Sequence, residues 1–432
     1  MKMNRWEKLS RIPAPHFAPK FGPLTGMRVL LSGTVVAAPF AAQLLADFGA
    51  ELIQIEFPKI GDAYRYQSPQ LFKEDGEGQT SAAWAQGARN RMSFTLNTNM
   101  SIPEAKEIFF CLIKQVDVWL ENMVWLKKLG IELKDLWEVN PKLIIGHSSG
   151  FGRPQFGGNE ETCDRPSYDP IGQAESGFMS INGDPEPEPP RYAASFVNDY
   201  LTATFLFGGI CAAYINVLNG GMGQEVDMAQ VEAFARVLDD QWISHIEAGV
   251  LKKRAGNRVP IFQPASLHQA GDGRWCFIGA FGKSVYYRAI EGLGLDPEYF
   301  KWEEAGNSFE AVWSDKGKEL YEETNKWFAA RPAQEAQEHM NKYKIPVGIV
   351  RNIKEIYEDP HWHDRKNFVK YHDQTLDREV EAFGFVPKFS QTPGNAWRGA
   401  PRLGQDTSTI MKELLGYSEE EVNSLKGKNI ID

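Results

Sequence analysis

A polar pair, Asn198 and Asp199, stands directly before a long apolar stretch of the chain. No residue from Tyr200 to Leu218 is charged, and Ala, Leu, Phe and Gly dominate there, which predicts a helix that is packed on nearly all sides. Asp199 would lie at the N-terminus of this helix, where the helix dipole and unpaired backbone N–H groups favour an ionised carboxylate. Such a carboxylate can act as a nucleophile, although by itself the position more often marks a simple helix cap.

Basic residues form a second group of candidates, because they lie at or near the ends of predicted strands in the first third of the chain. Together, their side chains could hold phosphate groups by charge and hydrogen bonding. Each one alone is more typical of a solvated surface charge. The group consists of Lys59, Arg65, Arg91, Lys127 and Lys128.

The histidines and cysteines do not suggest a metal site. The four cysteines are widely spaced without a CxxC pair, and the HWH sequence at 361–363 has no third ligand nearby in the sequence. We therefore expect no bound metal, and we expect free thiols in a reducing cytoplasm.

Charge and hydropathy argue against two other classes of partner. The formal net charge of -10 disfavours general binding to nucleic acid or to an anionic membrane. No stretch reaches the ~18 to 20 uninterrupted apolar residues of a membrane span. With 42% hydrophobic and 24% charged residues, the composition is that of an ordinary globular protein.

Strands and helices alternate along the first third of the chain, which predicts a doubly wound parallel sheet with ligands at the carboxyl ends of its strands. The first turn, SGTVVAAP, lacks the GxGxxG pattern, so a nicotinamide or flavin cofactor is not expected. The predicted strands cover 27–33, 51–56, 116–122 and 142–147, and the predicted helices begin at Pro39, Pro103 and Leu133.

The length of 432 residues favours two domains over one. From about residue 256 the pattern changes, and SLHQAGDGRWCFIGA predicts a hairpin through Gly271 and Gly273. We expect a large α/β domain over residues 1–226, a smaller α+β domain over 227–330, and a C-terminal segment, 331–432, that returns to the large domain.

Six segments resemble the class III CoA-transferase family, of the CaiB/BaiF type, and occur in the expected order. They are GPLTGMRVLLSGTVVAAPFAAQLLADFGAELIQIEFPKIGD (22–62), NRMSFTLN (90–97), NPKLIIGHSSGFG (140–152), SYDPIGQAESGFMSING (167–183), NDYLTATFLFGGICA (198–212) and GMGQEVDMAQVEA (221–233). The end of the chain, from PKFSQTPGNAWRGAPRLGQ onward, is similar to the carnitine and bile-acid CoA-transferase branch.

The resemblance implies that Asp199 is the catalytic carboxylate. In the family chemistry it attacks an acyl-CoA thioester to give a mixed anhydride, and CoA then forms an aspartyl-CoA thioester that an acceptor acid resolves. Tyr168 and Asp169 match a pair beside the catalytic carboxylate, where Asp169 would support it. Backbone N–H groups at the helix N-terminus are expected to stabilise the oxyanion.

The resemblance also implies a CoA site, with acyl-CoA as a substrate and no tightly bound cofactor. A small-residue turn approaches CoA, basic side chains lie near its phosphates, and an Asn-aromatic pair lines the nucleotide, although the aromatic residue is missing here. The matching positions are Val36, Ala37 and Ala38 for the turn, Lys59, Arg91, Lys127 and Lys128 for the basic side chains, and Asn122 and Met123 for the pair.

Two departures from the formyl-CoA transferases bear on the acceptor. The segment GNRVPIFQPASLHQAGDG contains no glycine run, and Ser149 stands where those enzymes have a lysine. Both differences indicate an acceptor larger than formate or oxalate, such as a carnitine-like, bile-acid-like or 2-hydroxy acid. A related α-methylacyl-CoA racemase would need a histidine in place of Tyr168, and a catalytically silent CoA-binding scaffold is the third alternative. The family further implies an interlaced homodimer.

Overall fold

The computed structural model describes residues 4–73, 76, 78–123 and 126–432, without the side chains of residues 127 and 128. The chain folds into two compact units. The large unit comprises Met1–Phe178, Ala193–Asp239 and His363–Asp432, and the small unit comprises Met179–Tyr192 and Asp240–Trp362.

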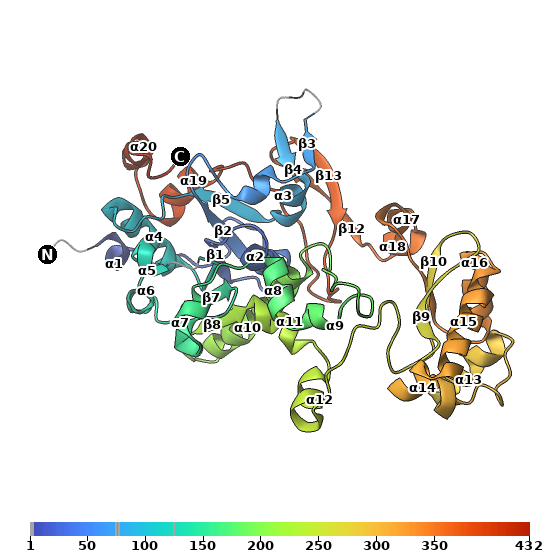
Figure 1. Cartoon of the computed structure of the whole chain (residues 1–432). Helices are drawn as coiled ribbons and strands as arrows, with labels where there is room; N and C mark the ends of the chain where they lie inside the picture. Colours follow the sequence, from blue (N-terminus) through green and yellow to red (C-terminus); the bar gives the residue numbers. More distant parts are fainter. Residues whose placement is uncertain (1–3, 74–75, 77, 124–125) are drawn as a thin grey trace. The chain divides into compact units, whose positions relative to one another are not determined.

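A six-stranded parallel sheet forms the centre of the large unit (Figure 1). Its spatial order is β5-β2-β1-β6-β7-β8, so the direction in which strands are added reverses between β1 and β6. In doubly wound sheets, ligands bind at the carboxyl ends of the strands beside this reversal. The sheet confirms the predicted parallel α/β architecture. The strands are β1 (Arg28–Leu31), β2 (Glu51–Glu56), β5 (Arg91–Thr95), β6 (Val118–Glu121), β7 (Ile144–Ser149) and β8 (Glu225–Ala229).

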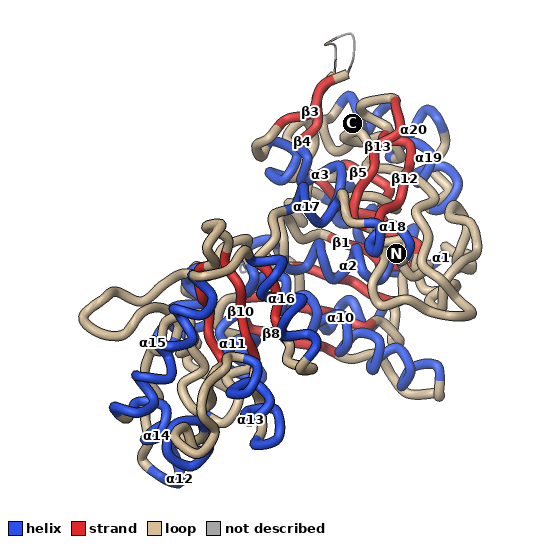
Figure 2. Tube along the Cα trace, turned by 90° about the vertical axis from the view of Figure 1, so that its right-hand side faces the viewer, coloured by secondary structure: helices blue, strands red, loops and turns tan. Residues whose placement is uncertain are grey.

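Helices cover both faces of this sheet, because neighbouring residues of each buried strand point to opposite sides. Leu31 of β1 packs with α2 (Ala37–Asp47) and α10 (Val197–Leu218), which lie side by side (Figure 2). Leu30 lies on the other face, in a core that also includes residues of α4 (Pro103–Gln115), α6 (Leu133–Val139) and α20 (Glu419–Gly427). The large unit is therefore built of three layers around two hydrophobic cores.

Helix α10 is buried on one face only, in contrast to the predicted packing on nearly all sides. Ala203, Leu206 and Ile210 are fully buried against the sheet and α2. On the opposite face, Ile215 is 59% exposed and Leu218 is 67% exposed. Uniform hydrophobicity hides this difference, because the sequence gives no information about which faces other elements cover.

The length and apolar composition of α10 bear on the expectation that no stretch could span a membrane. Among the helices of the described residues, α10 is long enough and apolar enough to span a membrane. The core helix of a protein without a membrane can be equally long and apolar, and one face of α10 packs on the sheet.

The small unit differs from the predicted range of 227–330, because it includes Met179–Tyr192 and its main segment, Asp240–Trp362, begins and ends later than predicted. Strand β8 joins the large sheet, and α11 (Gln230–Arg236) packs against α8 (Asp169–Glu175) and α10, so this part of the chain belongs to the large unit. In the small unit, β11 (Val347–Ile349) pairs with β10, so the C-terminal segment returns at residue 363 rather than 331.

The small unit contains the predicted hairpin, β9 (Ala265–Gln269) and β10 (Trp275–Gly279), with β11 as its third strand. Its helices include α12 (Gln241–Ala248), α13 (Lys283–Gly292), α15 (Asp315–Ala329) and α16 (Ala333–Lys342). Two further hairpins, which sequence patterns did not predict, belong to the large unit: β3 (Gln70–Phe72) with β4 (Gln79–Ser81), and β12 (Phe368–Asp373) with β13 (Arg378–Phe383).

Candidate active site

Asp199 is the third residue of α10, and 9% of it is exposed. The two residues before the helix, Ser195 and Phe196, both have left-handed backbone conformations, with φ of 68° and 52°. Such conformations are unfavourable for residues other than glycine, and they are often found where a backbone is held in place for function. The chain thus turns sharply into α10, close to Asp199.

Asp169 provides the cap of α10. Its Oδ1 atom accepts hydrogen bonds from the backbone N–H groups of Asn198, at 2.7 Å, and Asp199, at 3.1 Å. Its Oδ2 atom accepts a hydrogen bond of 2.7 Å from Gln173 Nε2. Helix α8 can approach this closely because Gly172 has no side chain. A Cβ atom there would lie 2.0 Å from Nδ2, the side-chain amide nitrogen of Asn198. The structure therefore places the predicted pair Asp169 and Asp199 together.

The side chain of Asp199 has a different partner, Gln230, which the sequence analysis did not identify. Gln230 Nε2 donates a hydrogen bond of 2.5 Å to Asp199 Oδ1, and Gln230 Oε1 accepts one of 2.7 Å from Ser167 Oγ. In the part of the chain that the structure describes, Asp199 Oδ2 accepts no hydrogen bond. One oxygen of Asp199 is thus fixed and the other is available for reaction.

Burial and the nearby charge of Asp169 raise the pKa of Asp199 to about 6, while the hydrogen bond from Gln230 opposes this rise. The helix N-terminus therefore does not lower the pKa of Asp199 below its usual value, because burial and the charge of Asp169 raise it. The expectation that free backbone N–H groups would stabilise an oxyanion fails for Asn198 and Asp199, because Asp169 occupies both. A carboxylate with a pKa near 6 is still mostly ionised at neutral pH and is more basic than an exposed aspartate.

The turn between β1 and α2 is held by two polar side chains. The backbone N–H of Val35, which has φ of 68°, donates to Asp62 Oδ1 at 3.1 Å. Asn122 pairs with the backbone of Thr34, accepting from its N–H at 3.0 Å and donating to its carbonyl at 2.9 Å. Asn122 thus shapes the predicted CoA turn, which continues into the buried residues Val36, Ala37 and Ala38 at the start of α2.

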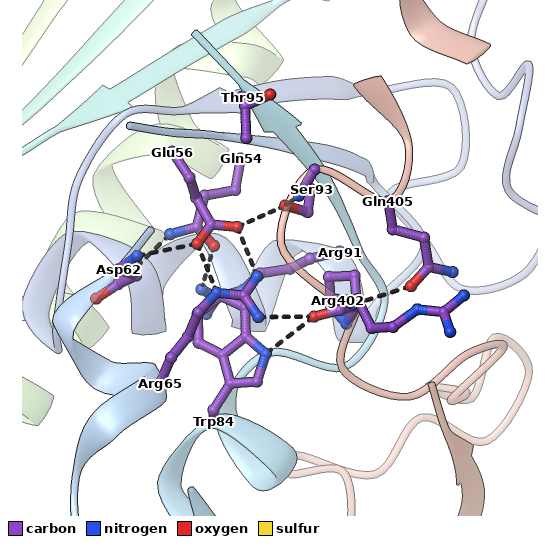
Figure 3. A network of polar contacts seen from close by, with 12 residues as sticks. Gln54, Glu56, Asp62, Arg65, Trp84, Arg91, Ser93, Thr95, Arg402 and Gln405 are labelled. Atoms are coloured by element: carbon purple, nitrogen blue, oxygen red, sulfur yellow. Dashed lines mark hydrogen bonds and ion pairs between the residues drawn. The ribbon is translucent and has the colours of Figure 1, made fainter. Parts of the chain in front are cut away.

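The basic residues near this turn bind protein groups. Arg91, which is 2% exposed, donates to Gln54 Oε1 and to the carbonyl of Pro39, both at 2.9 Å. Arg65 forms an ion pair with Glu56, and Lys59 Nζ donates to Asn429 Oδ1 at 2.6 Å. Figure 3 shows Glu56 between Arg65, Ser93 and the backbone N–H of Asp62. As placed, the Arg91 guanidinium supports the site from within and is not free to bind a phosphate.

A cavity of about 310 Å³ lies beside α2. Tyr200, the residue after Asp199, lines it together with two residues of the predicted CoA site, Val36 and Arg91. Tyr64 also lines it. The rest of its wall is mainly apolar: Val35, Pro39, Phe40, Leu44, Ala83, Gly87, Phe383, Gly384 and Val386, with Gln43, Asp47, Gln86 and Arg89 as polar members.

The remaining predicted residues lie elsewhere or cannot be placed. Tyr168 is 75% exposed, and no contact joins it to Asp199 in the described part of the chain. Met123 is held at its backbone by Glu121 and by Arg153, whose Nη2 donates to the Met123 carbonyl at 3.1 Å. Lys127 and Lys128 belong to α5 (Leu126–Leu129), but their side chains lie outside the described residues. Among the described residues, no group of three or more His, Cys, Asp or Glu side chains could hold a metal ion.

Comparison with known families identifies one match across most of the chain. The model of CoA-transferase family III matches residues 24–407. The bile acid CoA-transferase BaiK of Clostridium scindens is 34% identical over 420 residues, which cover 95% of this chain and 90% of that protein. The succinyl-CoA–D-citramalate CoA-transferase of Chloroflexus aurantiacus is 32% identical over 417 residues, which cover 95% and 98% of the two chains.

Solved structures share the fold. A CAIB/BAIF family protein from Brucella suis superposes with a TM-score of 0.76 at 24% identity, covering 91% of this chain and all of its own. The protein Rv3272 of Mycobacterium tuberculosis superposes with a TM-score of 0.74 at 21% identity, covering 90% of this chain and 99% of its own.

The contact between Asp169 and Asp199 predicts a shift in pH dependence. Replacing Asp169→Asn removes a negative charge that raises the pKa of Asp199, so this pKa falls below about 6. If Asp199 must be ionised to react, the acidic limb of a plot of kcat/KM against pH moves to lower pH. Glu175→Gln, on the exposed side of the same helix, serves as the matched control and leaves the limb in place. An unchanged or upward shift in Asp169→Asn would contradict this electrostatic coupling.

Proposed function

The chain belongs to CoA-transferase family III and is a CoA-transferase, and from this premise we propose that Asp199 carries the transferred CoA. The observation that supports this most strongly is the state of its carboxylate. It is buried and has a pKa of about 6, with Oδ1 held by Gln230 and Oδ2 unpaired in the described structure. These are the properties of a nucleophile held in position and shielded from water.

The proposed reaction has four balanced steps. Asp199 Oδ2 attacks the thioester carbonyl of the donor, and the C–S bond breaks to release CoA thiolate and leave a mixed anhydride. The thiolate then attacks Asp199 Cγ and expels the donor acid as its carboxylate, giving an aspartyl-CoA thioester. The acceptor carboxylate attacks Cγ, expels the thiolate and forms a second anhydride. Attack of the thiolate on the acceptor carbonyl yields the new acyl-CoA and restores Asp199.

This sequence of steps conserves the energy of the thioester. Thioester, anhydride and carboxylate interconvert without net proton transfer, so no general acid or base is required. Water would end the cycle by hydrolysing either intermediate. The burial of Asp199 between α8, α10 and α11 therefore matters as much as its reactivity.

The covalent route predicts an adduct that depends on Asp199. After incubation with a panel of acyl-CoAs, intact-protein mass spectrometry should show a hydroxylamine-sensitive adduct with the mass of CoA less one water. Asp199→Asn, which keeps the size of the side chain, and Asp199→Ala should form none and should lose transfer activity by about 10⁴-fold or more. Absence of any adduct, combined with exchange of the substrate α-proton in deuterated water, would instead support an α-methylacyl-CoA racemase. Absence of both signals would favour a CoA-binding scaffold.

We further propose that the acceptor is an apolar acid larger than formate or oxalate. The cavity of about 310 Å³ beside Tyr200 has a mainly apolar wall with the aromatic residues Phe40, Tyr64 and Phe383. An empty apolar cavity of about 150 Å³ holds one benzene molecule, so this space suits one ring with a short chain, or a branched aliphatic group. The four fused rings of a bile acid need more volume than this and would extend outside the cavity. Its charged members, Asp47, Arg89 and Arg91, include two cations, which disfavours a carnitine-like trimethylammonium group.

The size of the cavity predicts an order among acceptors. Rates of CoA transfer should be higher for aryl-lactates and branched 2-hydroxy acids than for formate, oxalate, carnitine or a bile acid. Ala83→Phe, which fills part of the cavity, should lower kcat/KM for the aryl acid by about tenfold or more, since each 1.4 kcal/mol lost is tenfold. Ala82→Phe, on the same helix, α3 (Ala82–Gly87), but outside the cavity wall, is the control. Equal losses in both variants would show that the cavity does not hold the acceptor.

We also propose that the enzyme is an interlaced homodimer. In the large unit, α10 exposes Phe205, Ile215 and Leu218 on one face, and in the small unit α12 exposes Ile243 and Ile246. Exposed apolar side chains of this kind, on each unit taken by itself, are unfavourable in water and are typical of a surface covered by another chain. A second copy of the chain is the occupant that the family relationship supports.

The dimer predicts a particle with twice the mass of one chain in light scattering at micromolar concentration. Ile215→Lys with Leu218→Lys places two charges on the exposed face of α10, and we expect it to shift the equilibrium toward monomers of lower thermal stability. Lys354→Glu, at an exposed position outside this face, is the control. A stable wild-type monomer would contradict the proposed assembly.

A further inference from the structure

We propose that Gln230 is a catalytic residue, whose side-chain amide stabilises the negative charge that develops on Asp199 Oδ1 when Asp199 Cγ is attacked. The inference rests on the covalent route proposed above. It assigns a specific hydrogen-bond donor to the oxyanion that forms on the Asp199 carboxyl group during the proposed reaction.

The orientation of the Gln230 amide follows from its two partners. An ionised carboxylate only accepts hydrogen bonds, so the Gln230 atom that lies 2.5 Å from Asp199 Oδ1 must be the donor Nε2. The carbonyl oxygen Oε1 then faces Ser167 Oγ, which donates to it at 2.7 Å. Gln230 is 7% exposed, so both hydrogen bonds are largely shielded from water. Ser167 therefore holds the amide in the orientation that donates to Asp199.

The chemistry places the developing charge on the oxygen that Gln230 contacts. When Oδ2 attacks the donor thioester, Oδ2 becomes the bridging oxygen of the anhydride and Oδ1 remains a carbonyl oxygen. Attack of the CoA thiolate on Cγ moves the carbonyl electron pair onto Oδ1, and its return expels the donor carboxylate. Attack of the acceptor carboxylate on the aspartyl thioester charges the same oxygen again. A donor already placed at Oδ1 stabilises both transition states without further rearrangement.

Other donors near Asp199 are already occupied. The N–H groups of Asn198 and Asp199 bind Asp169 Oδ1, and Gln173 Nε2 binds Asp169 Oδ2. Asp169, on α8, carries the negative charge that raises the pKa of Asp199. Gln230, on α11, donates the hydrogen bond to Asp199. In the described structure, Gln230 is thus the side chain that donates to the reacting carboxylate.

The test compares single-turnover and steady-state kinetics of Gln230→Ala, Gln230→Glu and Ser167→Ala with the wild type. Removing one oxyanion donor lowers kcat by about 10²–10³-fold in other enzymes, and we expect such a loss in Gln230→Ala, with KM for acyl-CoA little changed. Gln230→Glu keeps the size of the side chain, so it tests the donor even if the alanine variant folds poorly. Its carboxylate cannot donate, and it should be equally slow at neutral pH. Ser167→Ala should show a smaller loss in the same direction.

Two readouts separate this role from a structural one. Loss of the Gln230 hydrogen bond raises the pKa of Asp199 further. The acidic limb of the plot of kcat/KM against pH therefore moves to higher pH, opposite to the shift predicted for Asp169→Asn. The rate at which the aspartyl-CoA adduct forms should fall in parallel with kcat. Gln173→Ala removes a buried glutamine of the same cluster that does not touch Asp199, and we expect it to lower stability without an upward shift of the limb.

The outcomes distinguish the inference from the function on which it depends. The proposal would be supported if the wild type forms the adduct and both Gln230 variants form it about 10²-fold or more slowly. The acidic limb of the pH profile of Gln230→Ala must also lie at higher pH. The role of Gln230 alone would be overturned if folded Gln230→Glu forms the adduct at the wild-type rate and the acidic limb of the pH profile of Gln230→Ala is unchanged. A wild type that forms no adduct with any donor it uses would overturn the covalent route, and the inference with it.

Discussion

The hydrogen bonds between Asp169 and the first turn of α10 determine what Asp199 can do. A helix N-terminus needs an acceptor for its N–H groups, and Asp169 supplies it from α8. Asp199 is therefore not needed as a cap, and its carboxylate faces Gln230. The same arrangement places a second negative charge nearby, which together with burial raises the pKa of Asp199 to about 6. Asp169 thus caps the helix, and the Asp199 carboxylate is left without that role.

The fold brings this pair to the place where a parallel sheet binds ligands. The reversal of strand order between β1 and β6 places the Val35 turn and Asn122 at the carboxyl ends of adjacent strands. Asp62 and Asn122 hold that turn in its left-handed conformation, and Arg91 stabilises the start of α2 through the Pro39 carbonyl. Because α2 packs against α10, the turn and the Asp199 carboxylate share one side of the large unit.

The sequence alone was sufficient for features that depend on local patterns. The apolar runs of β1, β2, β6 and β7 predicted the parallel sheet, and the apolar stretch after Asp199 predicted the start of α10 closely.

Strand β5 was missed because RMSFT alternates polar and apolar residues, and the polar ones are buried against distant groups. Ser93 Oγ donates to Glu56, and Thr95 Oγ1 lies 3.0 Å from Thr407 Oγ1. Likewise, the contacts of Gln230 and Asp62 join segments far apart in the chain, and no spacing rule indicates them. The burial of Arg91 also depends on tertiary packing, since a basic residue after a turn gives no sign of the acceptors that surround it.

The most direct test of the account is to locate the covalent intermediate on the chain. After incubation with an acyl-CoA that the enzyme uses, hydroxylamine converts an activated aspartyl group into a hydroxamate, which tandem mass spectrometry of proteolytic peptides can assign to one residue. The account predicts a hydroxamate on Asp199 and none on Asp169, whose oxygens are occupied as the cap of α10 and by Gln173. A hydroxamate on Asp169, or activity with no modified carboxylate at all, would contradict it.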